Sequence, residues 1–126
     1  MAQDTKNFKV SEFACKHCGT NKIDQRVLNM AQEIRDYLGV PILINSGYRC
    51  EVHNKKVGGV KNSKHVQGKA ADLACSLGGT KIFNAIQELK QQGKLKDLDY
   101  YILYQKKNFV HIDCGGKRNR PYEIRA

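Results

Sequence analysis

Residues 24–45 restrict the fold most, because they require a helix and then a strand with only a short break between them. Apolar side chains recur at helical spacing in the first part, at Val27, Leu28, Ala31, Ile34 and Leu38. Asp24 can cap the start of this helix, and Gly39 followed by Pro41 ends it. Residues 41–45 (PILIN) then have the length and apolar character of a buried strand.

Polar and glycine-rich residues follow this strand. Residues 46–49 (SGYR) are expected to form a turn into a short polar helix near residues 50–56. Residues 58–68 are too rich in glycine and polar side chains for regular structure, and residues 70–74 (AADLA) resume a strand. The pattern therefore predicts a loop that brings His65 to the next strand.

The second half of the chain predicts another helix and a hairpin. Thr80 is expected to cap an amphipathic helix that continues to about Gln92. Residues 99–104 and 109–114 are rich in aromatic and β-branched side chains, and residues 105–108 connect them as a turn. This order of elements indicates an α+β fold in which helices flank a mostly antiparallel sheet.

Length and charge limit the classes of protein that fit. At 126 residues, the whole chain, residues 1–126, is expected to form a single domain and a monomer. The net charge of +10 favours polyanionic partners, but the basic residues are scattered among acidic ones, so no specific nucleic-acid partner is expected. No stretch approaches the ~20 apolar residues of a membrane helix, which predicts no membrane insertion.

The cysteines pose a separate question. Their odd number favours reduced thiols or metal binding over a disulfide framework: Cys15, Cys18, Cys50, Cys75 and Cys114. Cys15 and Cys18 have the C-x-x-C spacing of half a zinc site, but no second C-x-x-C or H-x-x-x-H follows. We interpret the pair as a packed turn with reduced thiols. The alternative is a second metal that recruits a distant ligand such as Cys50.

Three polar residues could meet where the predicted strands lie together. A catalytic zinc site uses three protein ligands and leaves one position for water. His65 ends the polar loop, and Asp72 follows seven residues later. His111 lies on the predicted hairpin, and Asp113, two residues further on, is expected to point to the same face of that strand. Each also has a simpler explanation, since a lone His is usually hydrogen-bonded and a lone Asp often closes a turn.

Two sequence strings carry a resemblance to a known family. SGYRCEVHNKKVGGVKNSKHVQGKAADL (residues 46–73) and FVHID (residues 109–113) resemble the zinc D-Ala-D-Ala carboxypeptidase superfamily, which includes vancomycin-resistance dipeptidases and phage L-alanyl-D-glutamate endopeptidases. NFKVSEFACKHCG (residues 7–19) is similar to the start of its small phage and bacterial branch. The resemblance spans residues 7–116 and implies the hedgehog-like metallopeptidase fold.

The resemblance also implies a cofactor and site residues. It implies zinc held by the residues that match the family's ligands, His65, Asp72 and His111. It gives Arg49 the role of binding the substrate carbonyl or carboxylate, and a guanidinium beside a zinc site can stabilise an oxyanion. Ser63 and Gln67 flank His65 and are expected to bind substrate or hold the loop.

The chain departs from the family at the general base. Well-known members place a Glu three residues before the last His, or a His two before it, whereas this chain has Asn108 and Phe109 there. Neither side chain can accept a proton. Asp113 is the nearest carboxylate in sequence, so we expect it to act as the base or to orient His111.

The function implied by the resemblance is zinc-dependent hydrolysis of a peptide bond in bacterial peptidoglycan. Both a D-Ala-D-Ala carboxypeptidase and an endopeptidase cutting L-Ala-D-Glu or a cross-link fit, and metal-activated water would be the nucleophile. A non-catalytic wall-binding zinc domain and, less favoured, a basic nucleic-acid-binding module are the alternatives. Because MAQDTKNFKV has no apolar stretch, we expect no signal peptide and a cytoplasmic protein until release, or a phage or virion component.

Overall fold

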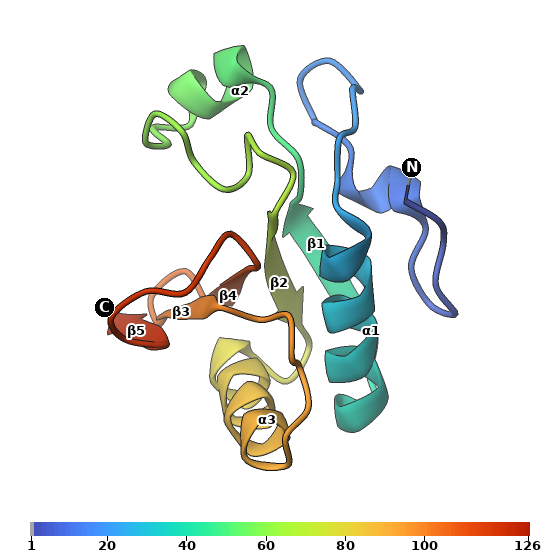
Figure 1. The fold of residues 1–126 in the computed structure, drawn as a ribbon, viewed down its shortest axis with the longest axis vertical. Helices are drawn as coiled ribbons and strands as arrows, with labels where there is room; N and C mark the ends of the chain where they lie inside the picture. The colour runs from blue at the N-terminus through green and yellow to red at the C-terminus, as the bar shows by residue number, and fades with distance from the viewer. Residues whose placement is uncertain (1) are drawn as a thin grey trace.

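The computed structural model describes residues 2–126, and it has three α-helices, one 3-10 turn and a five-stranded sheet. The elements in chain order are η1 (Val10–Phe13), α1 (Gln25–Leu38), β1 (Ile42–Ser46), α2 (Glu51–Lys56), β2 (Ala70–Cys75), α3 (Gly79–Gln91), β3 (Tyr100–Tyr104), β4 (Phe109–Asp113) and β5 (Tyr122–Arg125) (Figure 1). The strand order is β1-β2-β4-β3-β5, antiparallel except for the parallel pair β3 and β5. The predicted α+β class is confirmed.

The ends of α1 follow the sequence signals. The Asp24 carboxylate accepts the backbone N–H of Arg26 at 2.9 Å, so this residue caps the helix as predicted. Gly39 closes it in the left-handed conformation, with φ of 72° and its N–H donated to the Arg35 carbonyl. The side-chain hydrogen bond of Asp24 and the left-handed backbone of Gly39 therefore fix where the helix begins and ends.

The predicted cap of α3 was wrong. The helix begins at Gly79 with Gly78 in the capping position, so Thr80 lies inside the first turn. The free N–H of Gly79 is accepted at 2.8 Å by the side chain of Asn108, which comes from the turn between β3 and β4. A side chain distant in sequence replaces the local cap, and local pattern could not have indicated it.

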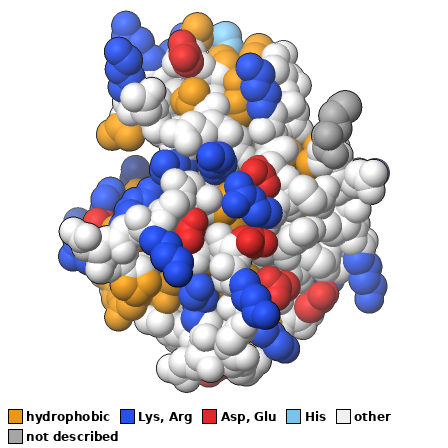
Figure 2. All heavy atoms as spheres, viewed as in Figure 1, with side chains coloured by type: hydrophobic (Ala, Val, Ile, Leu, Met, Phe, Trp, Pro, Cys, Tyr) orange, Lys and Arg blue, Asp and Glu red, His pale blue; other side chains and the backbone are white. Residues whose placement is uncertain are grey.

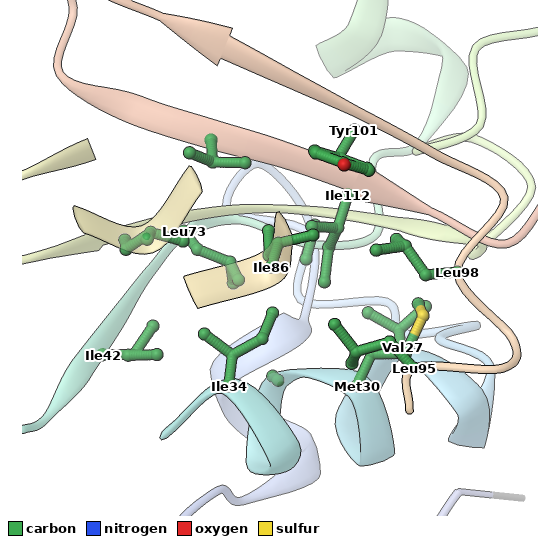
Figure 3. Close-up of a cluster of buried hydrophobic side chains, with 14 of the residues drawn as sticks. Val27, Met30, Ile34, Ile42, Leu73, Ile86, Leu95, Leu98, Tyr101 and Ile112 are labelled. Atoms are coloured by element: carbon green, nitrogen blue, oxygen red, sulfur yellow. The ribbon is translucent and has the colours of Figure 1, made fainter. Parts of the chain in front are cut away.

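Both long helices cover the same face of the sheet. Leu73 from β2 and Ile112 from β4 point toward them, and Ile34 from α1 and Ile86 from α3 pack into the same cluster (Figure 3). Contacts between α1 and α3 close this layer. Because side chains alternate along a strand, the neighbours of these apolar residues face the opposite side of the sheet, which the helices leave uncovered.

Two elements were not predicted from the sequence. The η1 turn places the fully buried Phe13 against the segment after β1, where the Phe13 carbonyl accepts the N–H of Tyr48 at 2.8 Å. At the other end of the chain, β5 pairs with β3, and Tyr122 packs on Phe83 and Tyr101 at ring separations of 5.4 Å. Both elements are too short and polar for periodicity to reveal them.

Charge is distributed over the surface without a basic stripe on the face that Figure 2 presents. Lys and Arg side chains spread across that face, and acidic side chains lie among them near its centre (Figure 2). In the described part of the chain, no helix is both long enough and apolar enough to cross a membrane.

Candidate metal centre

Three polar side chains meet on the sheet face that the helices do not cover. His65 comes from the loop before β2, Asp72 from β2 and His111 from β4, and one ligand atom of each lies within 4.8 Å of the other two. Oδ1 of Asp72 is 3.2 Å from Nε2 of His65 and 3.1 Å from Nδ1 of His111. The structure thus brings together the three residues that the sequence predicted as ligands.

The sheet register explains two of these positions. Asp72 lies directly opposite His111 in the antiparallel pair of β2 and β4, and directly opposite Ser46 of β1. Residues opposite one another on neighbouring strands share a face of the sheet. The side chains of Ser46, Asp72 and His111 therefore project to the same side of the sheet, away from the core. Of the three candidate ligands, only His65 has to be delivered by a loop.

The loop that carries His65 is fixed by backbone contacts. Gly68 has φ of 74° and passes so close to the Lys22 carbonyl that a side chain there would collide with it. The N–H of Gly68 bonds to the His65 carbonyl at 3.1 Å, and the same carbonyl accepts the N–H of Arg49. The N–H of His65 bonds at 3.1 Å to Oγ of Ser63. Ser63 therefore holds the loop that positions His65.

Hydrogen bonds orient the ring of each histidine toward Asp72. Nδ1 of His65 lies 2.8 Å from the Gly47 carbonyl, which can only accept, so this nitrogen donates and the Nε2 lone pair faces Asp72. Both ring nitrogens of His111 face carboxylates, Nε2 at 2.8 Å from Oδ2 of Asp113 and Nδ1 at 3.1 Å from Oδ1 of Asp72, so a metal ion in place of the Nδ1 proton would leave Nε2 as the donor to Asp113. With a metal in place of the Nδ1 proton, two imidazole lone pairs and a carboxylate oxygen would converge on one point.

A convergence of three lone pairs is stable only with a cation or extra protons. Burial alone would lower the pKa of His111, but its bonds to Asp113 and Asp72 outweigh burial and raise the pKa to about 9. Burial alone would raise the pKa of Asp72, but bonds from His111 and His65 hold it well below its ordinary value. Two imidazoles and one carboxylate are the donor set of catalytic zinc sites, so these residues fit a zinc ion with one open position.

Asp113 and Arg118 form a second layer behind His111. Asp113 is completely buried, and Nη1 and Nη2 of Arg118 lie 3.0 and 3.3 Å from its two carboxylate oxygens. Burial would raise the pKa of Asp113, yet the bonds from His111 and Arg118 lower it. The Arg118 guanidinium lies 4.3 Å from the centre of the Tyr100 ring. Arg118 was not predicted from the sequence, since no local pattern joins it to His111.

Arg49 reaches the same centre from the turn after β1. Its guanidinium lies 3.1 Å from Oγ of Ser46, 3.1 Å from Oδ1 of Asn54 and 3.4 Å from Oδ2 of Asp72. Asn54 is buried and donates in turn to the Val60 carbonyl at 2.8 Å. These contacts hold the planar group beside the three converging ligands, where the sequence prediction had placed it.

A pocket of about 550 Å³ opens over these residues. Its lining includes the three candidate ligands, Arg49 and Ser63, together with a carboxylate that the sequence did not indicate, Glu123 of β5. Its basic side chains are Arg49, Lys64, Lys107, Arg118 and Arg125. Gln67 is exposed and donates to the Asn62 carbonyl at 3.1 Å, outside the pocket lining.

Comparison with known proteins gives this arrangement a family. Residues 6–113 match the family described as Peptidase M15. Over 49 residues the chain is 43% identical to the zinc D-Ala-D-Ala carboxypeptidase of Streptomyces albus G. That match covers 38% of this chain and 19% of the relative, so the chain spans about a fifth of the length of this relative. Because the family match covers most of the chain and includes all three converging residues, the chain belongs to the peptidase M15 family.

Proposed function

We propose that this protein is a zinc-dependent peptidase that hydrolyses a peptide bond in bacterial peptidoglycan. The observation that carries the proposal is the convergence of His65, Asp72 and His111 within 4.8 Å in the lining of an open pocket. A zinc ion held there would lower the pKa of a bound water to about 7 and polarise the scissile carbonyl. Membership in the peptidase M15 family supports this chemistry.

Arg49 binds and orients the substrate in this proposal. Its guanidinium is fixed by Ser46, Asn54 and Asp72, so little side-chain entropy is lost when a carbonyl or carboxylate oxygen binds to its remaining N–H groups. A fixed cationic donor beside the reacting carbonyl stabilises the negative charge that develops on its oxygen.

Asp113 positions His111 rather than moving protons. Its carboxylate is completely buried, and both oxygens are engaged by His111 and Arg118. A carboxylate that accepts the N–H of a ligating histidine fixes the orientation of the ring and makes the other nitrogen a better ligand. A proton acceptor, by contrast, must have an oxygen that substrate or water can reach.

Glu123 is the proton acceptor that we propose instead. It lines the pocket, and its side chain is 19% exposed. Ile102 of β3 pairs with both Glu123 and His111, so the two residues lie on the same face of the sheet. Two strand spacings separate them by about 10 Å, a gap that a water and a substrate carbonyl can fill. Bonds from Tyr100 and Arg125 lower the pKa of Glu123 to about 2, so it is ionised at neutral pH, and its proton affinity would rise where substrate carboxylates draw Arg120 and Arg125 away.

The substrate follows from the lining of the pocket and from the relative. Five basic side chains line the pocket, and they suit a peptide that carries free carboxylates, as the stem peptides of peptidoglycan do. The relative from Streptomyces albus G is named as a zinc D-Ala-D-Ala carboxypeptidase. We propose a peptidoglycan stem or cross-link as the substrate, cut either as a carboxypeptidase or as an endopeptidase.

The test pairs metal content with turnover. Zinc is measured by elemental analysis on protein purified without a metal-affinity tag, and the release of new amino groups is measured on purified peptidoglycan. Asp72→Asn should lose turnover and the zinc ion of this centre, whereas Asp36→Asn, at an exposed position on α1, should keep both. A native chain that holds zinc but cuts no type of peptidoglycan would favour a non-catalytic wall-binding domain. A native chain without zinc would overturn the proposal.

A further inference from the structure

A second group of metal-binding side chains lies outside the peptidase centre. The sulfur atoms of Cys15, Cys18 and Cys50 all lie within 4.8 Å of one another. Cys15 and Cys18 precede α1, whereas Cys50 immediately precedes α2 and is 35 residues away from Cys15 along the chain. The fold thus supplies the distant ligand that the C-x-x-C pair lacks in the sequence.

The first two sulfurs are presented by a tight turn. The Cys15 carbonyl accepts the N–H of Gly19 at 2.8 Å, and the N–H of Cys15 bonds to the Thr20 carbonyl at 2.8 Å. Gly19 has φ of 76°, a conformation that glycine adopts without strain. The turn closes immediately after Cys18, so both side chains of the C-x-x-C pair are held on the side that faces Cys50.

Backbone N–H groups point at two of the sulfurs. The N–H of Cys50 lies 3.4 Å from Sγ of Cys15, and the N–H of His53 lies 3.4 Å from Sγ of Cys50. Donors directed at sulfur stabilise the thiolate form, which is the form that binds metal. Thiols that merely pack in an apolar environment do not need such donors, whereas thiolates that bind a cation do.

A disulfide does not account for the cluster. All five cysteines of the chain are free, and a bond between any two of the three would leave the third without a partner. In a tetrahedral zinc site, with Zn–S of about 2.3 Å, the sulfurs lie about 3.8 Å apart. Because no two of the three sulfurs are more than 4.8 Å apart, they need to approach by at most about 1 Å to reach this geometry.

We propose that Cys15, Cys18, Cys50 and His53 hold a second, structural zinc ion. Cys50 and His53 form a C-x-x-H pair at the start of α2, so each of the two segments supplies two ligands at the spacing that zinc sites use. The His53 ring is stacked on that of His17 at a ring separation of 6.2 Å, and its backbone N–H bonds to Sγ of Cys50. His17, whose Nδ1 lies 3.6 Å from Sγ of Cys50, is the competing ligand.

Four protein ligands close the coordination of the ion, so this site is structural and performs no hydrolysis. It joins the segment before α1 to the residue that follows Arg49. The backbone of Arg49 is thereby held from both sides, by the zinc ligand Cys50 and by the bond from its N–H to the His65 carbonyl. The second zinc would therefore stabilise the wall of the pocket without contacting the substrate.

The test counts zinc ions in variants that empty one site at a time. Elemental analysis of untagged protein should give about two zinc ions per native chain, about one for Cys50→Ser, about one for His65→Ala and close to none for the double variant. Cys75→Ser is the matched control, because Cys75 lies on β2 outside the cluster, and it should keep both ions. The His65→Ala variant separates a failure of this proposal from a failure of the peptidase proposal.

Cobalt substitution identifies the sulfur ligands directly. The native chain and His65→Ala loaded with Co²⁺ should both absorb in the near ultraviolet through thiolate-to-cobalt charge transfer, and Cys50→Ser should lose this band. His53→Ala should weaken the band, whereas His17→Ala should not. Loss of the band in His17→Ala alone would overturn the assignment of His53, and absence of the band from the native chain would overturn the site.

A measurement on the native chain covers the case in which Cys50→Ser does not fold. Cys18 is exposed, so its thiol should react quickly with a thiol reagent unless a metal holds it. We expect slow reaction in the zinc-loaded protein and at least a 10-fold acceleration after a chelator removes the metal. Equal rates before and after chelation would contradict the proposal.

Discussion

Asp72 on β2 lies directly opposite His111 on β4, and Oδ1 of the aspartate is 3.1 Å from Nδ1 of the histidine. This pairing joins the register of the sheet to the chemistry of the pocket. A slip of one residue in either strand would send one of the two side chains into the apolar core. The packing of Leu73 and Ile112 against the helices therefore also keeps the two candidate ligands on one face.

Asp113→Asn tests the proposed positioning of His111. The amide retains the shape of the side chain but loses the charge that favours an N–H donor on His111, so zinc affinity should fall about 10- to 100-fold. Competition with a chelator measures this affinity. Turnover should recover when excess zinc is added, and if zinc cannot restore it, Asp113 does more than orient the ring.

Glu123→Gln tests the proposed proton acceptor. The substitution should lower kcat by about 10²- to 10⁴-fold while zinc content stays at the native value, because Glu123 contacts no candidate ligand. Steady-state kinetics on a soluble stem peptide measures the loss. Glu88, on α3 and outside the pocket lining, provides a matched Glu→Gln control that should retain activity. A Glu123→Gln enzyme with native kcat would exclude this role.

Arg49→Lys tests the need for a fixed guanidinium. Lysine retains the positive charge but cannot contact Ser46, Asn54 and Asp72 at once. The expected loss in kcat is about 10²- to 10³-fold with zinc retained. Arg35→Lys on α1, outside the pocket, is the control. A rise in KM without any change in kcat would instead assign Arg49 to ground-state binding alone.

Gly47→Ala tests the contact between the N-terminal segment and the site. A Cβ at this position would lie 2.5 Å from the Phe13 carbonyl oxygen, so the backbone would have to move. Overpacking of this kind costs about 1–3 kcal/mol in the free energy of unfolding. Urea unfolding measures the change. Leu43→Ala on β1, at an exposed position, should alter stability much less, and an equal effect would show that the contact relaxes easily.

Asp24→Asn tests a charge effect on stability that depends on pH. The hydrogen bond from Arg26 outweighs burial and lowers the pKa of Asp24 in the folded chain. A lowered folded pKa contributes stability above the unfolded pKa of about 3.9, and this contribution is lost as pH falls through the folded pKa. Asparagine also caps helices, and Arg26 is partly exposed, so the difference at pH 7 should be about 0.5 kcal/mol.

Urea unfolding of the native chain and the Asp24→Asn variant at neutral and acidic pH measures this difference. The two curves should converge as the pH approaches 2. A difference that is constant with pH would mean that the charge of Asp24 contributes nothing and that only the shape of the cap matters.

Local signals were sufficient for most of the fold. The spacing of Val27, Leu28 and Ile34 requires a helix whatever the rest of the chain does, and the Asp24 and Gly39 signals mark its ends through contacts within a few residues. The cap of α3 was mispredicted because it depends on a contact between residues that are distant in the sequence. Its hydrogen bond comes from Asn108, and nothing near Thr80 in the sequence indicates that side chain.

The residues of the site likewise fall into those that the sequence indicated and those that only the tertiary structure reveals. The sequence indicated His65, Asp72 and His111, because residue type and spacing carry the resemblance to the family, and the structure brings them together. Arg118 and Glu123 were not indicated, since each reaches the pocket through tertiary contacts of the C-terminal segment. Such contacts leave no periodic trace in a sequence.

The parallel strand β5 has a consequence for the behaviour of the protein at high concentration. It covers the edge of β3, whose sequence YYILY is apolar and aromatic and would otherwise present unpaired backbone groups to solvent. An edge of that kind is a template for aggregation, whereas a strand of four residues that carries Glu123 and Arg125 is a poor one. The strand that supplies a carboxylate to the pocket thus also protects the sheet from pairing with other copies of the chain.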